Sequence, residues 1–152
     1  LREEGFRDTV LKDDRANITA SINVKSTITD AREGTERMLL DNPQINVIVT
    51  FNEWTTLGVG DAVEALEAGE RTQVVAFDSN VKSIGMLEKG NVDALIVQNP
   101  YAMGYLGIEQ INTLLNGQKP EKKETATSSI LVTRENMYDD KSQKALFSFE
   151  EK

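Results

Sequence analysis

Three apolar runs of this chain each end on a polar residue that can form hydrogen bonds but is a poor nucleophile. The polar residues are Asn52, Asp78 and Gln98, which follow the runs 45–51, 74–77 and 94–97. If helices separate the runs, the strands lie parallel and their last residues share one edge of a sheet, where open α/β folds bind ligands. Amide and carboxylate groups there suit a polyhydroxylated molecule. The pattern therefore favours recognition over catalysis.

Each of the three residues also has a purely structural interpretation as the cap of the next helix. For Asn52 taken alone, the capping and binding interpretations carry equal weight. Asp78 is less needed as a cap because Ser79 and Asn80 follow it, and Gln98 is a weak cap. The occurrence of all three at one predicted edge favours a binding site.

The only tryptophan, Trp54, follows Asn52 by two positions. Its indole could stack on the apolar face of a sugar ring, or it could pack as a lid against the neighbouring loop, and the sequence leaves both open. Glu53 is better explained as a negative charge at a helix N-terminus than as a ligand.

Several other motifs in the sequence are better explained without a function. Gly58-Val-Gly60 lies within a helical pattern and lacks the third glycine of a dinucleotide loop, because Val63 stands there. Asp78 does not fit the phospho-acceptor of a receiver domain, which needs an acidic pair and a lysine on other strand ends. Acidic pairs such as Asp13-Asp14 lack the alternating oxygen spacing of a calcium loop, so we expect no metal site and no cofactor.

Composition narrows the function further. The chain has 152 residues, a net charge of -8, no histidine and no cysteine. The acidic balance argues against nucleic-acid binding by this segment, since that needs clustered lysine and arginine. Without histidine or cysteine there is no Ser-His-Asp hydrolase, thiol catalysis or zinc finger. No apolar run approaches the roughly 20 residues that span a bilayer.

Apolar periodicity predicts alternating helices and strands. Helices are expected at 1–13, from Thr29 or Asp30 to 42, from Thr55 or Thr56 to 69, at 80–90 and at 101–116. Besides the three runs above, strands are expected at 17–23 and 129–133, followed by a partly irregular tail. This order predicts a three-layer αβα fold with a parallel sheet.

Ordered fragments along the chain resemble the periplasmic sugar-binding protein and lactose-repressor superfamily, a type I periplasmic binding fold, in particular its ribose-, galactose- and allose-type members. The fragments include Arg2-Glu-Glu-Gly-Phe6, Phe51-Asn-Glu53, Val75-Ala-Phe-Asp78, Met86-Leu-Glu-Lys-Gly90, Val97-Gln-Asn-Pro100 and Val132-Thr-Arg-Glu-Asn136. Each fragment is weak by itself, and their order and spacing carry the resemblance from Arg2 to Asn136.

The resemblance implies that Arg2, Asn52, Asp78 and Gln98 hydrogen-bond sugar hydroxyls, with Trp54 as a further candidate. Arg2 otherwise would be an ordinary helix-surface arginine. Two departures stand out: residues 24–30 lack the aromatic residue that the family often places after this strand, and Ala76 precedes Phe77-Asp78 where glycine is usual. The stacking partner then comes from Trp54 or from elsewhere, or the ligand is not a simple pyranose.

The resemblance also implies a two-lobed protein of which this chain is the C-terminal portion. Residues 1–98 would be the second lobe without its first strand and helix. Asn99-Pro100 would be a hinge, and residues 99–128 would carry a helix that packs on the first lobe. Residues 129–152 would be a returning strand and tail. The apolar helix would then need the first lobe, on the same protein or a companion chain, and alone the chain would self-associate.

The function that the resemblance favours is non-catalytic sugar binding in the receptor of an ABC importer, with a permease as partner. Such a protein would be extracytoplasmic, in the periplasm or lipid-anchored at the surface of a Gram-positive cell. The alternatives are the effector core of a lactose-repressor-type regulator, which would be cytoplasmic, and the sensory domain of a membrane receptor. A small α/β enzyme that acts on a sugar through Asp78 is the alternative from a different class.

Overall fold

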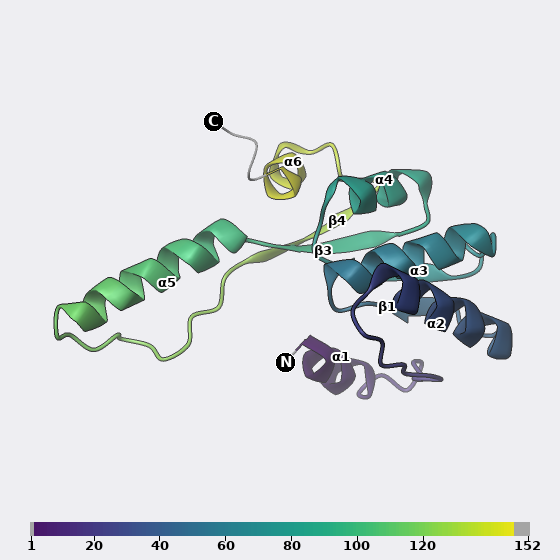
Figure 1. The fold of residues 1–152 in the computed structure, drawn as a ribbon, viewed down its shortest axis with the longest axis horizontal. Coiled ribbons are helices and arrows are strands. Elements are labelled where there is room, and N and C mark those ends of the chain that lie inside the picture. Colours follow the sequence, from purple (N-terminus) through teal and green to yellow (C-terminus); the bar gives the residue numbers. More distant parts are fainter. Residues whose placement is uncertain (1, 148–152) are drawn as a thin grey trace.

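The computed structural model describes residues 2–147 (Figure 1). The elements follow in the order α1 (Arg2–Val10), α2 (Ile28–Asp41), β1 (Val47–Val49), α3 (Glu53–Ala65), β2 (Gln73–Phe77), α4 (Val81–Lys89), β3 (Ala94–Gln98), α5 (Pro100–Leu115), β4 (Ser129–Thr133) and α6 (Asp140–Leu146). The predicted αβα class is confirmed.

The four strands form one sheet in the order β1-β2-β3-β4. The first three strands are parallel, and β4 pairs antiparallel to β3, so the sheet is mixed where a parallel one was expected. The reason is visible in Figure 1: the chain leaves the carboxyl end of β3, runs out along α5 and returns to the same end of the sheet. A strand that enters from that end must run opposite to its neighbour.

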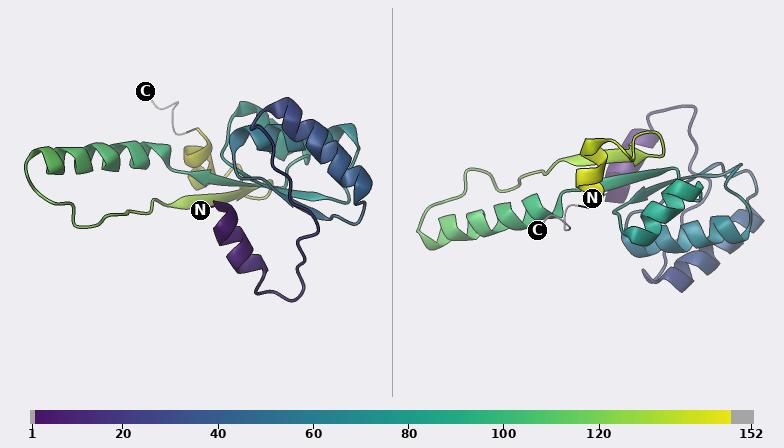
Figure 2. Two further views of the ribbon diagram at one scale, coloured as in Figure 1. Left: turned by 60° about the horizontal axis from the view of Figure 1, so that its bottom comes forward. Right: turned by 90° about the horizontal axis from the view of Figure 1, so that it is seen from above.

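Helices α2, α3 and α4 lie on one side of the sheet and α1 lies on the other (Figure 2). The core lies between the sheet and the first three of these helices, and its fully buried members include Leu39, Val63, Val74, Leu87 and Leu95. Buried side chains on both α3 and β2 hold the carboxyl ends of the strands in place. The polar residues predicted from sequence follow these strand ends.

Helix starts follow capping chemistry. Thr27 caps α2 through a bond from the Asp30 nitrogen, two positions before the predicted start. Asn80 caps α4 in a reciprocal capping box with Ser83. Because Asn80 caps this helix, the side chain of Asp78 is not used for capping, in agreement with the prediction from sequence.

The predicted strand at 17–23 is wrong. Residues 16–25 carry neither helix nor strand in the structure. The segment packs against α2, where the space beside Gly34 is closed by Ile22 and Val24. The alternating pattern is therefore real, but no described strand lies next to this segment, and a strand needs a partner for its backbone groups.

Helix α5 projects from the body together with the returning segment 116–128 (Figures 1 and 2). No residue of α5 is buried, although the helix carries a single charge, Glu109. The tail, which was expected to be partly irregular, contains turns and the helix α6, whose Leu146 joins the core with Met137. Residues 148–152 of the tail lie outside the described residues. Among residues 2–147, no helix is long and apolar enough to cross a membrane.

Candidate functional site

Asp78 is the centre of a polar cluster at the carboxyl edge of the sheet. Its Oδ2 lies 3.2 Å from Nη1 of Arg2, and its Oδ1 accepts a hydrogen bond from Nε2 of Gln98. These residues come from three separate elements, α1, the turn after β2 and the end of β3. The fold therefore brings together three of the residues predicted from sequence.

The backbone at Asp78 has a left-handed conformation, with φ of 68°. Such a conformation is uncommon for a residue other than glycine, although aspartate tolerates it better than most. The Asp78 nitrogen donates to the carbonyl of Ile96 at 3.1 Å, which holds the turn against β3. The side chain of Asp78 is 27% exposed, so the carboxylate remains accessible at the sheet edge.

Arg2 is tied to the sheet edge by two further contacts. Its Nη1 donates to the carbonyl of Phe51 at 2.6 Å, and its guanidinium lies 5.0 Å from the ring centre of Phe77. The rings of Phe51 and Phe77 are 6.1 Å apart, and Phe6 of α1 packs edge-on to Phe51 at 5.8 Å. Aromatic residues and a cation thus fix the start of α1 over the ends of β1 and β2.

Asn52 caps α3. Its Oδ1 accepts from the nitrogen of Thr55 at 3.0 Å. The capping interpretation is therefore confirmed for Asn52, while its Nδ2 donates to no other described residue. The next residue, Glu53, accepts a hydrogen bond from Nδ2 of Asn80, which links the first turns of α3 and α4.

Trp54 lies in the first turn of α3 and is 52% exposed. No contact of Trp54 with other residues in the range 2–147 indicates a sugar-stacking role or a lid role.

Asn99 caps α5 by accepting a hydrogen bond from the Ala102 nitrogen, and Pro100 occupies the first turn of that helix. Gln98 does not cap a helix, as its weak capping tendency predicted.

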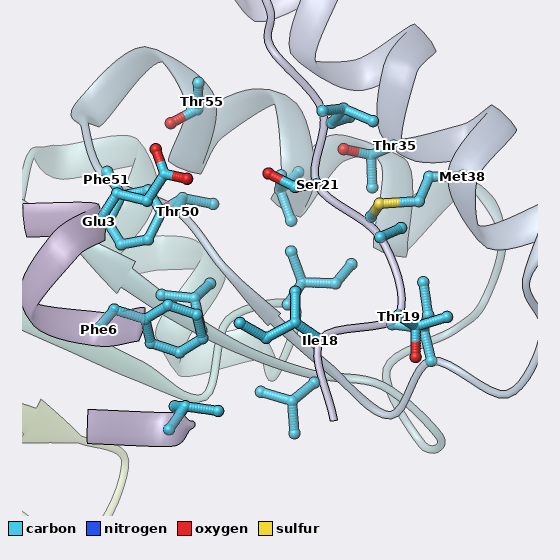
Figure 3. A pocket seen from close by; sticks show the side chains of 18 of the residues that line it. Glu3, Phe6, Ile18, Thr19, Ser21, Thr35, Met38, Thr50, Phe51 and Thr55 are labelled. Atoms are coloured by element: carbon cyan, nitrogen blue, oxygen red, sulfur yellow. The ribbon is translucent and has the colours of Figure 1, made fainter. Parts of the chain in front are cut away.

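A groove lies beside this cluster. It has a volume of about 710 Å³ and runs between the open edge of β1, helices α1 and α2, and the segment 16–24. Figure 3 shows Ile18 pointing into it between Phe6 and Phe51 on one side and Met38 on the other. Apolar and polar residues line the groove in nearly equal numbers, and Asp78, Arg2 and Gln98 are not among them.

Sequence reasoning missed the residues that support the cluster. Phe51 and Phe77 each directly precede a predicted site residue, and the Thr56 hydroxyl lies within hydrogen-bond distance of the carbonyls of Asn52 and Phe77. The adjacency of the phenylalanines to Asn52 and Asp78 was a usable signal. No sequence signal marks Thr56, because only the fold brings the Phe77 carbonyl near its hydroxyl.

The chemistry available to the cluster is reversible hydrogen bonding. A carboxylate offers about four acceptor positions and a guanidinium five donors, so Asp78 and Arg2 retain capacity beyond their mutual contact. No group of three or more acidic side chains that could hold a metal ion occurs among residues 2–147.

Comparisons with known proteins identify the family of the chain. Residues 1–119 match the family described as periplasmic binding protein domain. The ribose import binding protein RbsB of Haemophilus influenzae is 29% identical over 122 residues, which is 80% of this chain and 41% of that protein.

Solved structures give the same picture. A carbohydrate transporter solute-binding protein from Agrobacterium radiobacter in complex with D-arabinose superposes with a TM-score of 0.88 at 30% identity, over 95% of this chain and 49% of the other. An ABC transporter solute-binding protein from Agrobacterium vitis with bound D-fucose gives 0.87 at 26% identity, over 96% and 50%. The chain thus spans about half the length of these relatives. With its fold and most of its length matched, the chain belongs to the periplasmic binding protein domain family.

Proposed function

We propose that this chain binds a sugar or a related polyol without covalent chemistry. The observation that carries the proposal is the Asp78 carboxylate, held at the carboxyl edge of the sheet by Arg2 and Gln98. Two relatives of the same fold are described with D-arabinose and D-fucose bound, which supports a sugar as the ligand class. The relatives are named for solute binding and import, and the proposal contains no reaction step.

Each side chain has a distinct role in the proposal. Asp78 accepts hydrogen bonds from two hydroxyls through its remaining lone pairs, and Arg2 donates through nitrogens other than the one facing Asp78. Asn52 donates through Nδ2, since its Oδ1 is used by the helix cap. Gln98 accepts through its Oε1, because its nitrogen faces Asp78. Trp54 stacks on the apolar face of the sugar ring.

The proposal extends to a two-lobed protein that closes on its ligand. Residues 1–98 form the ligand-binding second lobe, Asn99-Pro100 acts as a hinge, residues 99–128 pack on the first lobe, and residues 129–152 return to the second lobe. The exposed and nearly uncharged helix α5 supports this division, since a large exposed apolar surface usually marks an interaction site.

The groove beside β1 supports the proposed absence of the first strand of this lobe. Among residues 2–147 no strand pairs with the outer edge of β1, and the segment 16–24, in which apolar and polar residues alternate, faces it across the groove. An extended strand added at this edge would pair with the free backbone groups of β1, because neighbouring strands lie about 4.8 Å apart. The absent helix of this lobe remains a prediction from sequence.

As the biological setting we propose the receptor of an ABC importer, outside the cytoplasm and with a permease as partner. Two of the relatives above are named as transporter proteins and a third for ribose import. A repressor core or a membrane sensor would use the same module. The residues ahead of the module would distinguish them: a lipoprotein or export signal, a helix-turn-helix, or a transmembrane helix.

The test is a thermal-shift screen of pentoses, hexoses and polyols against the full-length protein. A ligand that binds only the folded state increases the free energy of unfolding, by about 2.7 kcal/mol at a concentration of 100 times Kd. The melting temperature rises as a result. We expect at least one monosaccharide to do so. No shift with any sugar, or turnover of a sugar or sugar phosphate in a parallel assay, would contradict the proposal.

A further inference from the structure

Two buried threonines connect the carboxyl ends of β1 and β2 beneath the polar cluster. Thr50 is 4% exposed and Thr56 is 0% exposed. Their Oγ1 atoms lie 2.8 Å apart. The Thr56 Oγ1 atom also lies 2.9 Å from the carbonyl oxygen of Asn52 and 3.1 Å from that of Phe77.

A carbonyl oxygen only accepts, and either hydroxyl of the threonine pair can donate to the other. When Thr50 donates to Thr56, the single Thr56 proton is available for a carbonyl. The Thr56 nitrogen donates to the Asn52 carbonyl at 3.0 Å, and the Thr55 hydroxyl lies 2.9 Å from that carbonyl and 3.1 Å from the Asn52 Oδ1. The Asn52 carbonyl thus has other donors within helix α3, whereas the Thr56 hydroxyl is a donor that reaches from α3 to the Phe77 carbonyl.

The Phe77 carbonyl and the Asp78 nitrogen belong to the same peptide group. The Thr56 hydroxyl holds one side of this group, and the carbonyl of Ile96 accepts from the Asp78 nitrogen on the other side. The peptide leads directly into the left-handed conformation of Asp78. Such a conformation persists only where the surroundings impose it.

We infer that Thr56 is a positioning residue that sets the direction of the Asp78 carboxylate. Through the Phe77 carbonyl it holds the Asp78 peptide in the orientation from which the carboxylate meets Arg2 and Gln98. The consequence for ligand affinity rests on the proposed sugar binding, whereas the consequence for the Asp78 backbone does not.

Three variants of the full-length protein isolate this role from general stability. Thr56→Val removes the hydroxyl at nearly constant shape, and Thr56→Ala removes it without added bulk if the valine variant fails to fold. Thr56→Ser keeps the hydroxyl and serves as the conservative rescue. The matched control is Thr72→Val: Thr72 is 1% exposed, and its hydroxyl donates to the Ile45 carbonyl at 3.1 Å near the opposite end of β2.

The first measurement is amide hydrogen exchange by NMR without any ligand. We expect Thr56→Val or Thr56→Ala to speed exchange of the Asp78 amide about tenfold or more, because local opening no longer has to break the hydroxyl bond. The Asp93 amide, which donates to Val74 at 2.9 Å at the other end of the strand, is the internal reference. Unchanged Asp78 exchange, or equal acceleration by Thr72→Val, would overturn the inference.

The second measurement is the Kd of the sugar that the thermal-shift screen identifies. We expect Thr56→Val to weaken binding about tenfold, and Thr56→Ser and Thr72→Val to change it by less than about twofold. In an Asp78→Asn background, Thr56→Val should add little, because the two act on one group. Equal factors in both backgrounds would overturn the inference. If no sugar binds the parent protein, the proposed function fails, and amide exchange still decides the role of Thr56.

Discussion

For single residues, helix capping and ligand binding are compatible functions at Asn52. Its Oδ1 closes the first turn of α3, and its Nδ2 points to no other described partner. At Asp78 the two functions separate, because Asn80 caps α4. The role of an asparagine or aspartate at a strand end is therefore assigned atom by atom, and the Asp78 carboxylate contacts Arg2 and Gln98 instead of capping a helix.

Arg2 provides a prediction at this scale. Replacement by alanine removes both the Asp78 contact and the Phe51 carbonyl contact. We expect affinity for the sugar to fall about tenfold or more, corresponding to about 1.4 kcal/mol or more. Isothermal titration of the full-length variant measures it.

The control for Arg2 is Arg7 on the same helix. Arg7 pairs with Glu3 at 2.8 Å in an exposed (i, i+4) contact, which contributes little. Arg7→Ala should leave the Kd within about twofold of the parent. Equal losses for both variants would show that the effect of Arg2 is only on the stability of α1.

Much of the polar cluster could be predicted from sequence because the strand ends are local features. An apolar run that stops on Asp78 or Gln98 is visible in the sequence, and a parallel sheet brings such ends together. The contact of Thr56 with the Phe77 carbonyl could not be predicted, since it depends on the spacing of α3 from β2. The same holds for the ring of Phe77 beneath Arg2.

For whole elements, the contacts of α3 with α2 and with α4 explain the glycines that superficially suggested a nucleotide loop. A Cβ added at Gly58 would lie 2.5 Å from both the Ala31 Cβ and the Ile28 carbonyl. At Gly60 it would meet the sulfur of Met86, which is the end of a flexible side chain. Gly58 therefore allows close packing of two helices, and Gly60 permits a more adaptable contact.

Gly58→Ala should destabilise the fold by about 1–3 kcal/mol, because two backbones must move apart. Urea denaturation at one fixed protein concentration measures the change. The matched control is Gly85→Ala in α4, where nothing lies within 4 Å of the added Cβ. This variant should raise stability by about 0.5–1 kcal/mol through helix propensity. A loss of stability at Gly85 as large as at Gly58 would contradict the packing explanation.

The elements that failed prediction did so for tertiary reasons. The alternation at 17–23 is typical of a strand, yet strand formation depends on a neighbour that the described chain does not provide. The antiparallel direction of β4 depends on the path of α5 and the returning segment, which periodicity does not report. Helices with strong caps, such as α4 between Asn80 and Gly90, were located closely.

For the whole molecule, the projecting α5 arm is the main unsatisfied surface. Ile108, Ile111, Leu114 and Leu115 are each more than half exposed, at 68%, 53%, 57% and 82%. An apolar surface of this kind usually marks an interaction site. The first lobe is the partner that the proposal assigns, and without it a second copy can cover the same face.

The chain of residues 1–152 should therefore self-associate in isolation, and Ile111→Lys with Leu114→Lys should shift it towards monomer. Multi-angle light scattering over a concentration series measures the mass. Leu40→Lys on α2 is the control, because Leu40 is 69% exposed but lies outside the arm. A compact monomer for the unmodified chain would count against the need for a partner on α5.

The most direct test of the account is calorimetric titration of the full-length protein with the sugar identified by screening, comparing the parent with Asp78→Ala. Asp61→Ala is the control, since Asp61 pairs with Lys82 away from the cluster. We predict that Asp78→Ala weakens binding by about 2–5 kcal/mol, because it leaves Arg2 and the ligand hydroxyls without their acceptor. Unchanged affinity in Asp78→Ala would remove Asp78 from the site and contradict the account.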